Sequence, residues 1–222
     1  MKYWISAALW LAAPIAAQVA VSLAAPSAQN YSKTLKVDLD RDGKIETLIL
    51  DAKRDPTLTI YKGKTKTWSG IPRRWKPWKM TTGDVDGDGK QDIILGVHKS
   101  TRFLPFEHNC LFIWGFDGKA ATKKWLGSSL SKPFSDFMLF DIDGDKEDEL
   151  IALEEKQNGR KCVVVYSWIG FGFGSDWQSG DWEKAKLQRV ETNKIIVEAD
   201  GKTVFVVKPK VVQSEAVQNV VQ

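Results

Sequence analysis

The sequence contains few of the residues on which most hydrolytic and redox enzymes depend. Among its 222 residues are two histidines and two cysteines. It has no Gly-x-Ser-x-Gly elbow, no His-Glu-x-x-His motif and no phosphate-binding glycine loop, so these common catalytic signatures are absent. The formal net charge is only +4, which gives no reason to expect nucleic acid as a partner. Nothing in this composition points directly to catalysis.

Aspartate, by contrast, is concentrated in three short segments, residues 38–46, 84–92 and 141–149. Each segment has carboxylates at its positions 1, 3, 5 and 9 and then enters an apolar run. Like charges crowded into one turn are unfavourable unless a cation neutralises them. Ca²⁺ accepts about 6–8 oxygen ligands from flexible loops. We therefore predict calcium loops, and the alternative is a set of acidic turns that bind nothing.

The spacing excludes the EF-hand, which needs a bidentate glutamate at position 12. Position 12 is Ile49, Leu95 and Ala152 in the three segments. The apolar runs that follow are short and rich in isoleucine and leucine, which is typical of buried strands. Each acidic loop is therefore expected to connect two strands.

The three loops are not equivalent at position 6, where the chain must turn sharply. Gly43 and Gly89 occupy this position in the first two loops, and Lys146 occupies it in the third. A non-glycine residue in a left-handed conformation costs about 1–2 kcal/mol. We expect the second loop to bind Ca²⁺ most tightly, the first somewhat less, and the third weakly or not at all.

The N-terminus resembles a secretory signal. One lysine, Lys2, precedes an apolar stretch that ends in small residues near Ala28. We predict that residues 1–28 are a cleaved signal peptide, and the alternative is an uncleaved membrane anchor. Either outcome places the remaining chain outside the cytoplasm, as a secreted, periplasmic or cell-surface protein.

The loops belong to a longer repeat within residues 29–222. They recur at spacings of 46 and 57 residues, from 38 to 84 and from 84 to 141, which suggests propeller blades. The expected units are about 33–70, 77–127, 134–180 and 184–213. The fourth has Glu191-Thr192-Asn193-Lys194 where an acidic loop is due. The sequence thus predicts an all-β fold, a small β-propeller-like array of about four four-stranded blades, three of them with calcium loops.

Three further expectations follow from the repeat. Either the segment around Tyr31 or Val211-Val212 could complete the last blade. Trp68, Trp125 and Trp177 are in phase with the units, so we expect them to pack between blades. Cys110 and Cys162 open corresponding strands, which generally lie too far apart for a disulfide. We expect free thiols, although an exported chain could form the bridge.

At the acidic loops the chain resembles the FG-GAP/VCBS repeat family of integrin-like β-propellers and secreted bacterial proteins. The resemblance rests on the Asp-x-Asp-x-Asp-Gly-x-x-Asp pattern and covers roughly residues 34–180. It implies blades of four antiparallel strands with Ca²⁺ held between the first two. The implied side-chain ligands are Asp84, Asp86, Asp88 and Asp92, then Asp38, Asp40, Asp42 and Glu46, then Asp141, Asp143, Asp145 and Glu149. The implied backbone carbonyl ligands are those of Lys44, Lys90 and Glu147.

Two segments are candidates for ligand binding. The longest insertion in any unit is the loop of residues 98–109, which contains both histidines together with Lys99, Arg102, Phe103 and Phe106. Long loops on rigid scaffolds often carry binding residues, although this loop could equally pack over its blade.

The second segment interleaves basic and aromatic residues. We expect Arg73, Arg74 and Trp75 to be exposed and Trp78 to be structural. Such a surface suits anionic groups through charge and stacking.

The favoured hypothesis is a non-catalytic calcium-binding module that recognises a protein or glycan at the cell envelope or outside it. No nucleic acid is expected as a partner, and a membrane only through an uncleaved anchor. The alternative is a small secreted hydrolase or lyase built around the His98–His108 loop, with His98 or His108 as base and Glu107 or a serine nearby. A third hypothesis is a structural envelope protein without a soluble ligand.

Overall fold

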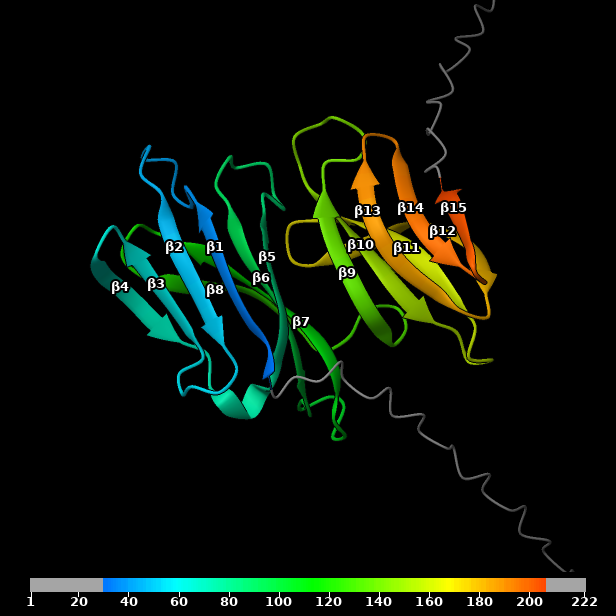
Figure 1. Ribbon diagram of the computed structural model, residues 1–222, viewed down its shortest axis with the longest axis horizontal. Coiled ribbons are helices and arrows are strands. Elements are labelled where there is room, and N and C mark those ends of the chain that lie inside the picture. Colours follow the sequence, from blue (N-terminus) through cyan, green and yellow to red (C-terminus); the bar gives the residue numbers. More distant parts are fainter. Residues whose placement is uncertain (1–29, 207–222) are drawn as a thin grey trace, which may run out of the picture.

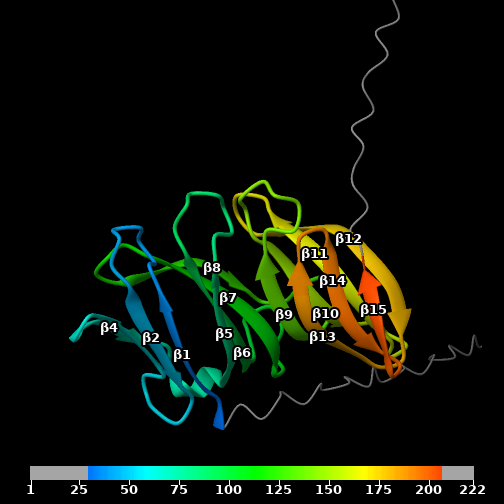
Figure 2. The ribbon, with the colours of Figure 1, turned by 45° about the horizontal axis from the view of Figure 1, so that its top comes forward.

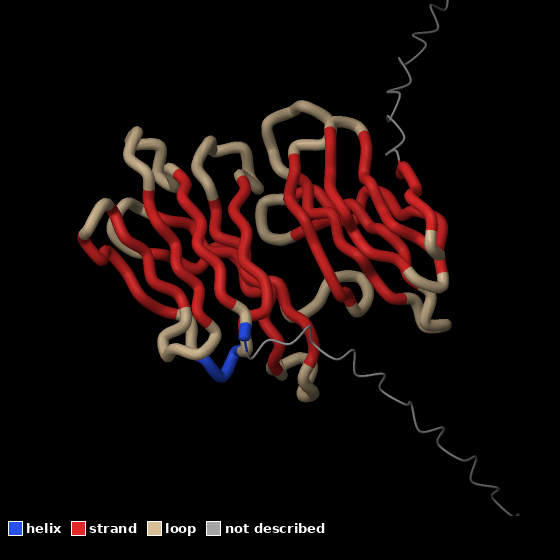
Figure 3. The backbone as a smooth tube through the Cα atoms, in the orientation of Figure 1, coloured by secondary structure: helices blue, strands red, loops and turns tan. Residues whose placement is uncertain are grey.

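Strands account for most of the chain in residues 30–206, the part that the computed structural model describes (Figure 1, Figure 3). Fifteen strands form four antiparallel sheets, and each sheet is built from strands that are consecutive in the sequence. The predicted signal segment 1–28 and Val211-Val212 lie outside the described residues. None of the helices in residues 30–206 is long and apolar enough to cross a bilayer.

The first three sheets have four strands each. The first consists of β1 (Ser32–Val37), β2 (Glu46–Asp51), β3 (Leu58–Lys62) and β4 (Thr65–Gly70). The second consists of β5 (Pro77–Gly83), β6 (Asp92–Lys99), β7 (His108–Phe116) and β8 (Ala121–Gly127). The third consists of β9 (Phe134–Phe140), β10 (Glu149–Glu155), β11 (Lys161–Trp168) and β12 (Phe173–Trp182). A 3₁₀ turn, η2 (Arg73–Trp75), connects the first sheet to the second.

The fourth sheet has three strands in the described residues, β13 (Ala185–Glu191), β14 (Lys194–Ala199) and β15 (Lys202–Val206). The prediction that Tyr31 completes it is wrong. The Tyr31 carbonyl accepts a hydrogen bond from the Ala52 amide at 2.9 Å, and its hydroxyl accepts one from the Met80 amide at 3.1 Å. Tyr31 therefore joins the first sheet to the second, at the other end of the array.

The burial of the strands shows how the sheets are stacked. β2 alternates between buried and half-buried residues, so one of its faces is fully covered. β6 and β10 are buried on both faces except at their last residues, since their sheets have a neighbour on each side. The second and third sheets therefore lie inside the stack, and the first sheet lies at one end of it.

Three hydrophobic clusters join consecutive sheets. One combines Leu48 and Ile60 with Leu95 from the second sheet, and the next two repeat this arrangement between later sheets. In residues 30–206 no cluster combines the first sheet with the fourth, so within this part of the chain the blade-like sheets are not closed into a ring. Figure 2 shows the first two sheets on one side and the last two on the other.

Aromatic contacts connect the sheets as expected. Trp68 lies 6.0 Å from Trp114 of the second sheet, measured between ring centroids. Trp125 packs edge-on against Trp168 and Phe173 of the third sheet. Trp177 packs on the cluster between the third and fourth sheets. The in-phase tryptophans are therefore packing residues.

Cys110 and Cys162 are buried and free, as expected. They belong to two different hydrophobic clusters, one on each side of the second sheet. The repeat therefore separates the two thiols, and packing rather than a covalent bridge stabilises this part of the array.

Candidate functional site

The three acidic loops lie at one end of the array. They connect β1 to β2, β5 to β6 and β9 to β10, which is the strand-to-strand placement that the sequence predicts. These turns are at the top of the molecule in Figure 1. The β13–β14 turn, which contains Asn193, lies at the same end, at the position where a fourth acidic loop is due.

All three loops share one hydrogen-bond frame. The amide at position 6 donates to the carboxylate at position 1, and the amide at position 7 donates to the carboxylate at position 5. The position 6 bonds are Gly43 to Asp38 at 2.9 Å, Gly89 to Asp84 at 2.7 Å and Lys146 to Asp141 at 3.0 Å. The position 7 bonds are Lys44 to Asp42 at 2.9 Å, Lys90 to Asp88 at 2.8 Å and Glu147 to Asp145 at 2.8 Å. The backbone therefore folds each loop around its own carboxylates.

An apolar anchor at position 2 is a functional feature that the spacing analysis missed. Leu39, Val85 and Ile142 are fully buried, so each loop is pinned into a hydrophobic cluster. In the first loop the Leu39 amide donates to Glu46 Oε2 at 2.9 Å, and the third loop has the matching bond from Ile142 to Glu149. The signal was visible as an apolar residue between the first two aspartates of every copy.

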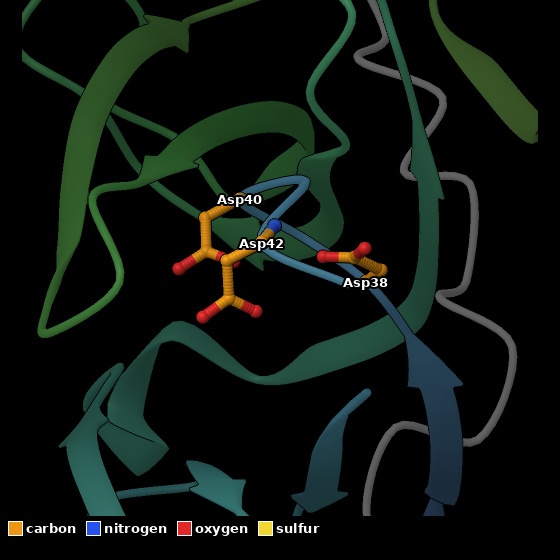
Figure 4. Close-up of side chains that lie close together, drawn as sticks. All are labelled: Asp38, Asp40 and Asp42. Carbon is orange, nitrogen blue, oxygen red and sulfur yellow. The ribbon is translucent and has the colours of Figure 1, made fainter. Parts of the chain in front are cut away.

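Carboxylate oxygens converge in each loop. Asp38, Asp40 and Asp42 place one oxygen each within 4.8 Å of the others, and Figure 4 shows the three side chains on their short loop. Asp84, Asp86 and Asp88 do the same in the second loop. The third group instead combines Asp141 and Asp143 with Glu149, so Asp145 does not belong to it.

Several of these oxygens have no hydrogen-bond donor. Asp38 Oδ1, Asp84 Oδ1 and Asp86 Oδ1 are buried without a hydrogen-bond partner, and Asp84 as a whole is only 6% exposed. A buried polar atom without a partner costs about 1–3 kcal/mol, and more when the group is charged. A hard cation would satisfy these oxygens, so the donor set of the first two loops fits Ca²⁺.

Two loops contain a strained backbone position. Lys146 has a φ of 81°, close to the 80° of Gly43 and the 83° of Gly89, so it adopts the left-handed conformation that the sequence predicts. Arg41, at position 4 of the first loop, has a φ of 59°, and the other two loops have glycine there. The first loop therefore carries a backbone cost that the comparison at position 6 did not reveal.

Lys62 and Lys124, which the spacing analysis missed, reach into the first two loops. Lys62 Nζ lies 2.6 Å from Asp42 Oδ2, and this bond lowers the pKa of Asp42 and raises that of Lys62. Lys124 Nζ lies 2.8 Å from Asp92 Oδ1. Burial raises the pKa of Asp92 to about 6, against the opposing effect of the Lys124 ammonium.

The loops also contact one another along the array. The Gln91 amide donates to the Leu39 carbonyl at 3.0 Å, and the Asp148 amide donates to the Asp84 carbonyl at 2.6 Å. The Asn193 amide donates to the Ile142 carbonyl at 2.9 Å. Consecutive loops, including the turn at Asn193, therefore form one hydrogen-bonded chain.

The basic and aromatic candidates come together at the opposite end of the array. η2, at the bottom of Figure 1, lies beside the loop of residues 100–107. Lys76 Nζ lies 2.5 Å from Glu107 Oε1, and Lys99 Nζ lies 5.9 Å from the centroid of the Trp75 ring. Two segments that the sequence presents separately thus form one surface, which we call the basic–aromatic surface. Its residues are Arg73, Arg74, Lys99, Arg102, Phe103 and Phe106.

Exposure within this region differs from the prediction at one residue. Arg73, Arg74 and Arg102 are exposed, and Phe103 and Phe106 are 79% and 52% exposed. Trp75 is half-buried rather than exposed, because it packs edge-on against Phe112 with ring centroids 5.3 Å apart. Trp75 therefore supports the surface from beneath, and Trp78 is buried as expected.

Residues 38–95 match the family described as FG-GAP-like repeat. This chain carries an FG-GAP-like repeat. The matched segment begins at Asp38 of the first acidic loop and ends in β6, just after the second loop. A comparison with curated proteins finds no match.

The two histidines lie in strands of the second sheet, not in the loop where the enzyme hypothesis placed them. His98 belongs to β6, is 8% exposed, and its Nδ1 lies 3.0 Å from Asn109 Oδ1. His108 begins β7, and its two ring nitrogens face the carbonyls of Phe106 and Ser128 at 2.8 and 2.5 Å. Both rings are thus occupied by contacts that hold strands and connections together.

The second sheet does bring one cysteine close to a histidine. Cys110 Sγ lies 3.4 Å from His108 Nε2. Burial raises the pKa of the Cys110 thiol to about 11, and the thiolate is the nucleophilic form. The geometry therefore resembles a nucleophile–base pair, but the electrostatics keep this thiol protonated.

Proposed function

We propose that this chain is an exported calcium-binding recognition module without catalytic activity, which binds a protein or glycan at the cell envelope or outside it. The FG-GAP-like repeat at residues 38–95 supports a repeat module for recognition. The single observation that carries the calcium assignment is the set of buried carboxylate oxygens without a partner, at Asp38, Asp84 and Asp86.

In this proposal the carboxylates of the first two loops, with the backbone carbonyl at position 7 of each, would hold Ca²⁺, and the third loop binds it weakly or not at all. The ion supplies positive charge and additional coordination bonds. Hydrogen bonds of the chain itself connect the loops. The Asp148 carboxylate of the third loop accepts one from the Asp84 amide of the second loop at 2.8 Å. This bond and the amide–carbonyl bonds between loops link neighbouring sheets at the acidic end. Ordering one loop therefore stiffens the next.

The basic–aromatic surface is the proposed site of recognition. It lies at the end of the array remote from the acidic loops, so the two ends differ in charge. Arg73, Arg74 and Arg102 are exposed, and none of them has an ion-pair partner among the contacts of the described residues. Exposed arginines, together with an exposed Phe103, favour carboxylate, sulfate or phosphate groups through bidentate hydrogen bonds and stacking. The expected ligand is accordingly an anionic glycan or an acidic protein segment.

Replacing both Arg73 and Arg102 with alanine tests this assignment. We expect the double variant to bind immobilised heparin or polyglutamate about tenfold more weakly than the unchanged chain, because exposed ion pairs contribute about 0.2–1 kcal/mol each. The salt dependence of binding should also decrease. Surface plasmon resonance at several ionic strengths measures both effects.

Lys123→Ala is the matched control, because Lys123 is an exposed cation on β8, outside the basic–aromatic surface. The Lys123→Ala variant should bind heparin and polyglutamate with the affinity of the unchanged chain. The affinity for calcium should be the same in all three proteins. Equal binding by the double variant and the unchanged chain, or no binding of either polymer, would contradict the assigned surface.

A further inference from the structure

A lysine ammonium occupies the acidic cluster of the first loop. Lys62 is the last residue of β3, and its Nζ lies 3.2 Å from Asp40 Oδ2, 2.6 Å from Asp42 Oδ2 and 3.1 Å from Glu46 Oε1. These carboxylates stand at positions 3, 5 and 9 of the loop. Three carboxylates thus lie within ion-pairing distance of one ammonium group, but Glu46 Oε1 has no hydrogen-bond partner.

The second loop has the same arrangement with a lysine from a different strand. Lys124 lies in β8, and its Nζ is 2.8 Å from both Asp86 Oδ2 and Asp92 Oδ1. These are positions 3 and 9 of the loop. Lys62 comes from the third strand of its sheet and Lys124 from the fourth, so the shared arrangement does not follow from the repeat itself.

The ammonium groups do not satisfy every oxygen. Asp38 Oδ1 and Glu46 Oε1 in the first loop, and Asp84 Oδ1 and Asp86 Oδ1 in the second, remain buried without a hydrogen-bond partner. Three N–H donors cannot replace the 6–8 oxygen contacts that Ca²⁺ makes. With the lysine in place, only some of the carboxylate oxygens of each loop have a partner. A bound metal ion would provide partners for more of them.

The ammonium groups of both lysines can move out of the acidic loops. Each side chain is 21% exposed, so a path to solvent exists, and the long flexible stem of lysine allows the ammonium to swing outward. A divalent ion and an ammonium repel one another at the few ångströms that separate positions 3, 5 and 9. Metal binding in these loops therefore requires the lysine to withdraw.

We propose that Lys62 and Lys124 are resident counter-cations, which hold the first two loops closed without metal and compete with Ca²⁺ for the same carboxylates. This inference rests on the proposed calcium binding and describes how the two lysines regulate it. Its consequence is a fold that tolerates calcium depletion, with metal affinities in these loops lower than their carboxylate number would give.

The test replaces each lysine with methionine in the full chain, because methionine keeps much of the apolar stem and removes the charge. We expect Lys62→Met and Lys124→Met each to bind Ca²⁺ at least about tenfold more tightly at one site, measured by isothermal titration calorimetry. In EDTA both variants should melt below the unchanged chain, and added Ca²⁺ should remove that difference. Lys64→Met and Lys123→Met are matched controls, since both residues are exposed neighbours of the two lysines.

The outcomes separate the two proposals. If the unchanged chain and the methionine variants bind Ca²⁺ with the same affinity, the lysine inference is wrong and calcium binding stands. If no variant binds Ca²⁺, both are wrong. If the variants tighten calcium binding but heparin and polyglutamate do not bind, the lysine inference stands and the recognition surface fails.

Discussion

Replacing Asp84 with asparagine is expected to raise the melting temperature of the metal-free protein and to lower that of the calcium-loaded protein. Asp84 Oδ1 is buried without a partner, so removing the negative charge relieves an unfavourable buried carboxylate when no ion is present. With Ca²⁺ the same change removes a charged ligand, and ligand charge sets calcium affinity in such loops. We expect the second site to weaken by about 30-fold or more, which is about 2 kcal/mol.

Asp84→Ala is the comparison that separates metal affinity from folding. The Gly89 amide donates to Asp84 Oδ2 at 2.7 Å, a bond that asparagine can keep and alanine cannot. Alanine should therefore lower the melting temperature both with and without metal. Differential scanning calorimetry in EDTA and in Ca²⁺ measures all four states. Identical behaviour of the asparagine variant and the unchanged chain in both buffers would show that Asp84 is a turn residue only.

Phe137→Ala is expected to lower the free energy of unfolding by about 3–5 kcal/mol. Phe137 is fully buried between the second and third sheets. Its ring meets Trp78 edge-on at 5.6 Å and Phe134 at 6.4 Å, measured between centroids. Gly96 of the second sheet also lies close to this ring, so the surrounding backbone has little room to collapse into the cavity.

Urea denaturation measures this effect, and Phe103→Ala is the control. Phe103 is 79% exposed on the basic–aromatic surface, so its loss should change stability by no more than about 0.5 kcal/mol. Equal effects of the two substitutions would mean that the second and third sheets do not pack as one unit.

The local features of the chain could be predicted from the sequence because they repeat. The acidic loops, the strands that follow them and the in-phase tryptophans recur in the same order in each unit, so each copy supports the others. Even the degenerate fourth loop is recognisable, since Asn193 bonds to Ile142 much as Gln91 bonds to Leu39. Its position follows from the period although its aspartates are absent.

The features that the sequence did not reveal depend on tertiary contacts. Lys62 is 22 residues from Asp40, and Lys124 is 38 residues from Asp86, so no local pattern connects them. The half-burial of Trp75 depends on Phe112 in a strand of the next sheet. The histidines were misplaced because β6 and β7 extend further along the chain than their apolar cores indicate. Tyr31 does not join the fourth sheet because its hydroxyl accepts a hydrogen bond from the Met80 amide in the second sheet.

The most direct test of the central claim, that the acidic loops are cation cages which connect neighbouring sheets, is the melting of the purified full chain with EDTA and with excess Ca²⁺. At about 100 times the dissociation constant, each occupied site adds about 2.7 kcal/mol. For a chain of this size one site should raise the melting temperature by about 5–10 °C. We expect a folded protein in EDTA, which the two lysines keep closed, and a higher melting temperature with Ca²⁺. Superimposable melting curves in the two buffers, together with no bound calcium by mass spectrometry, would contradict the account.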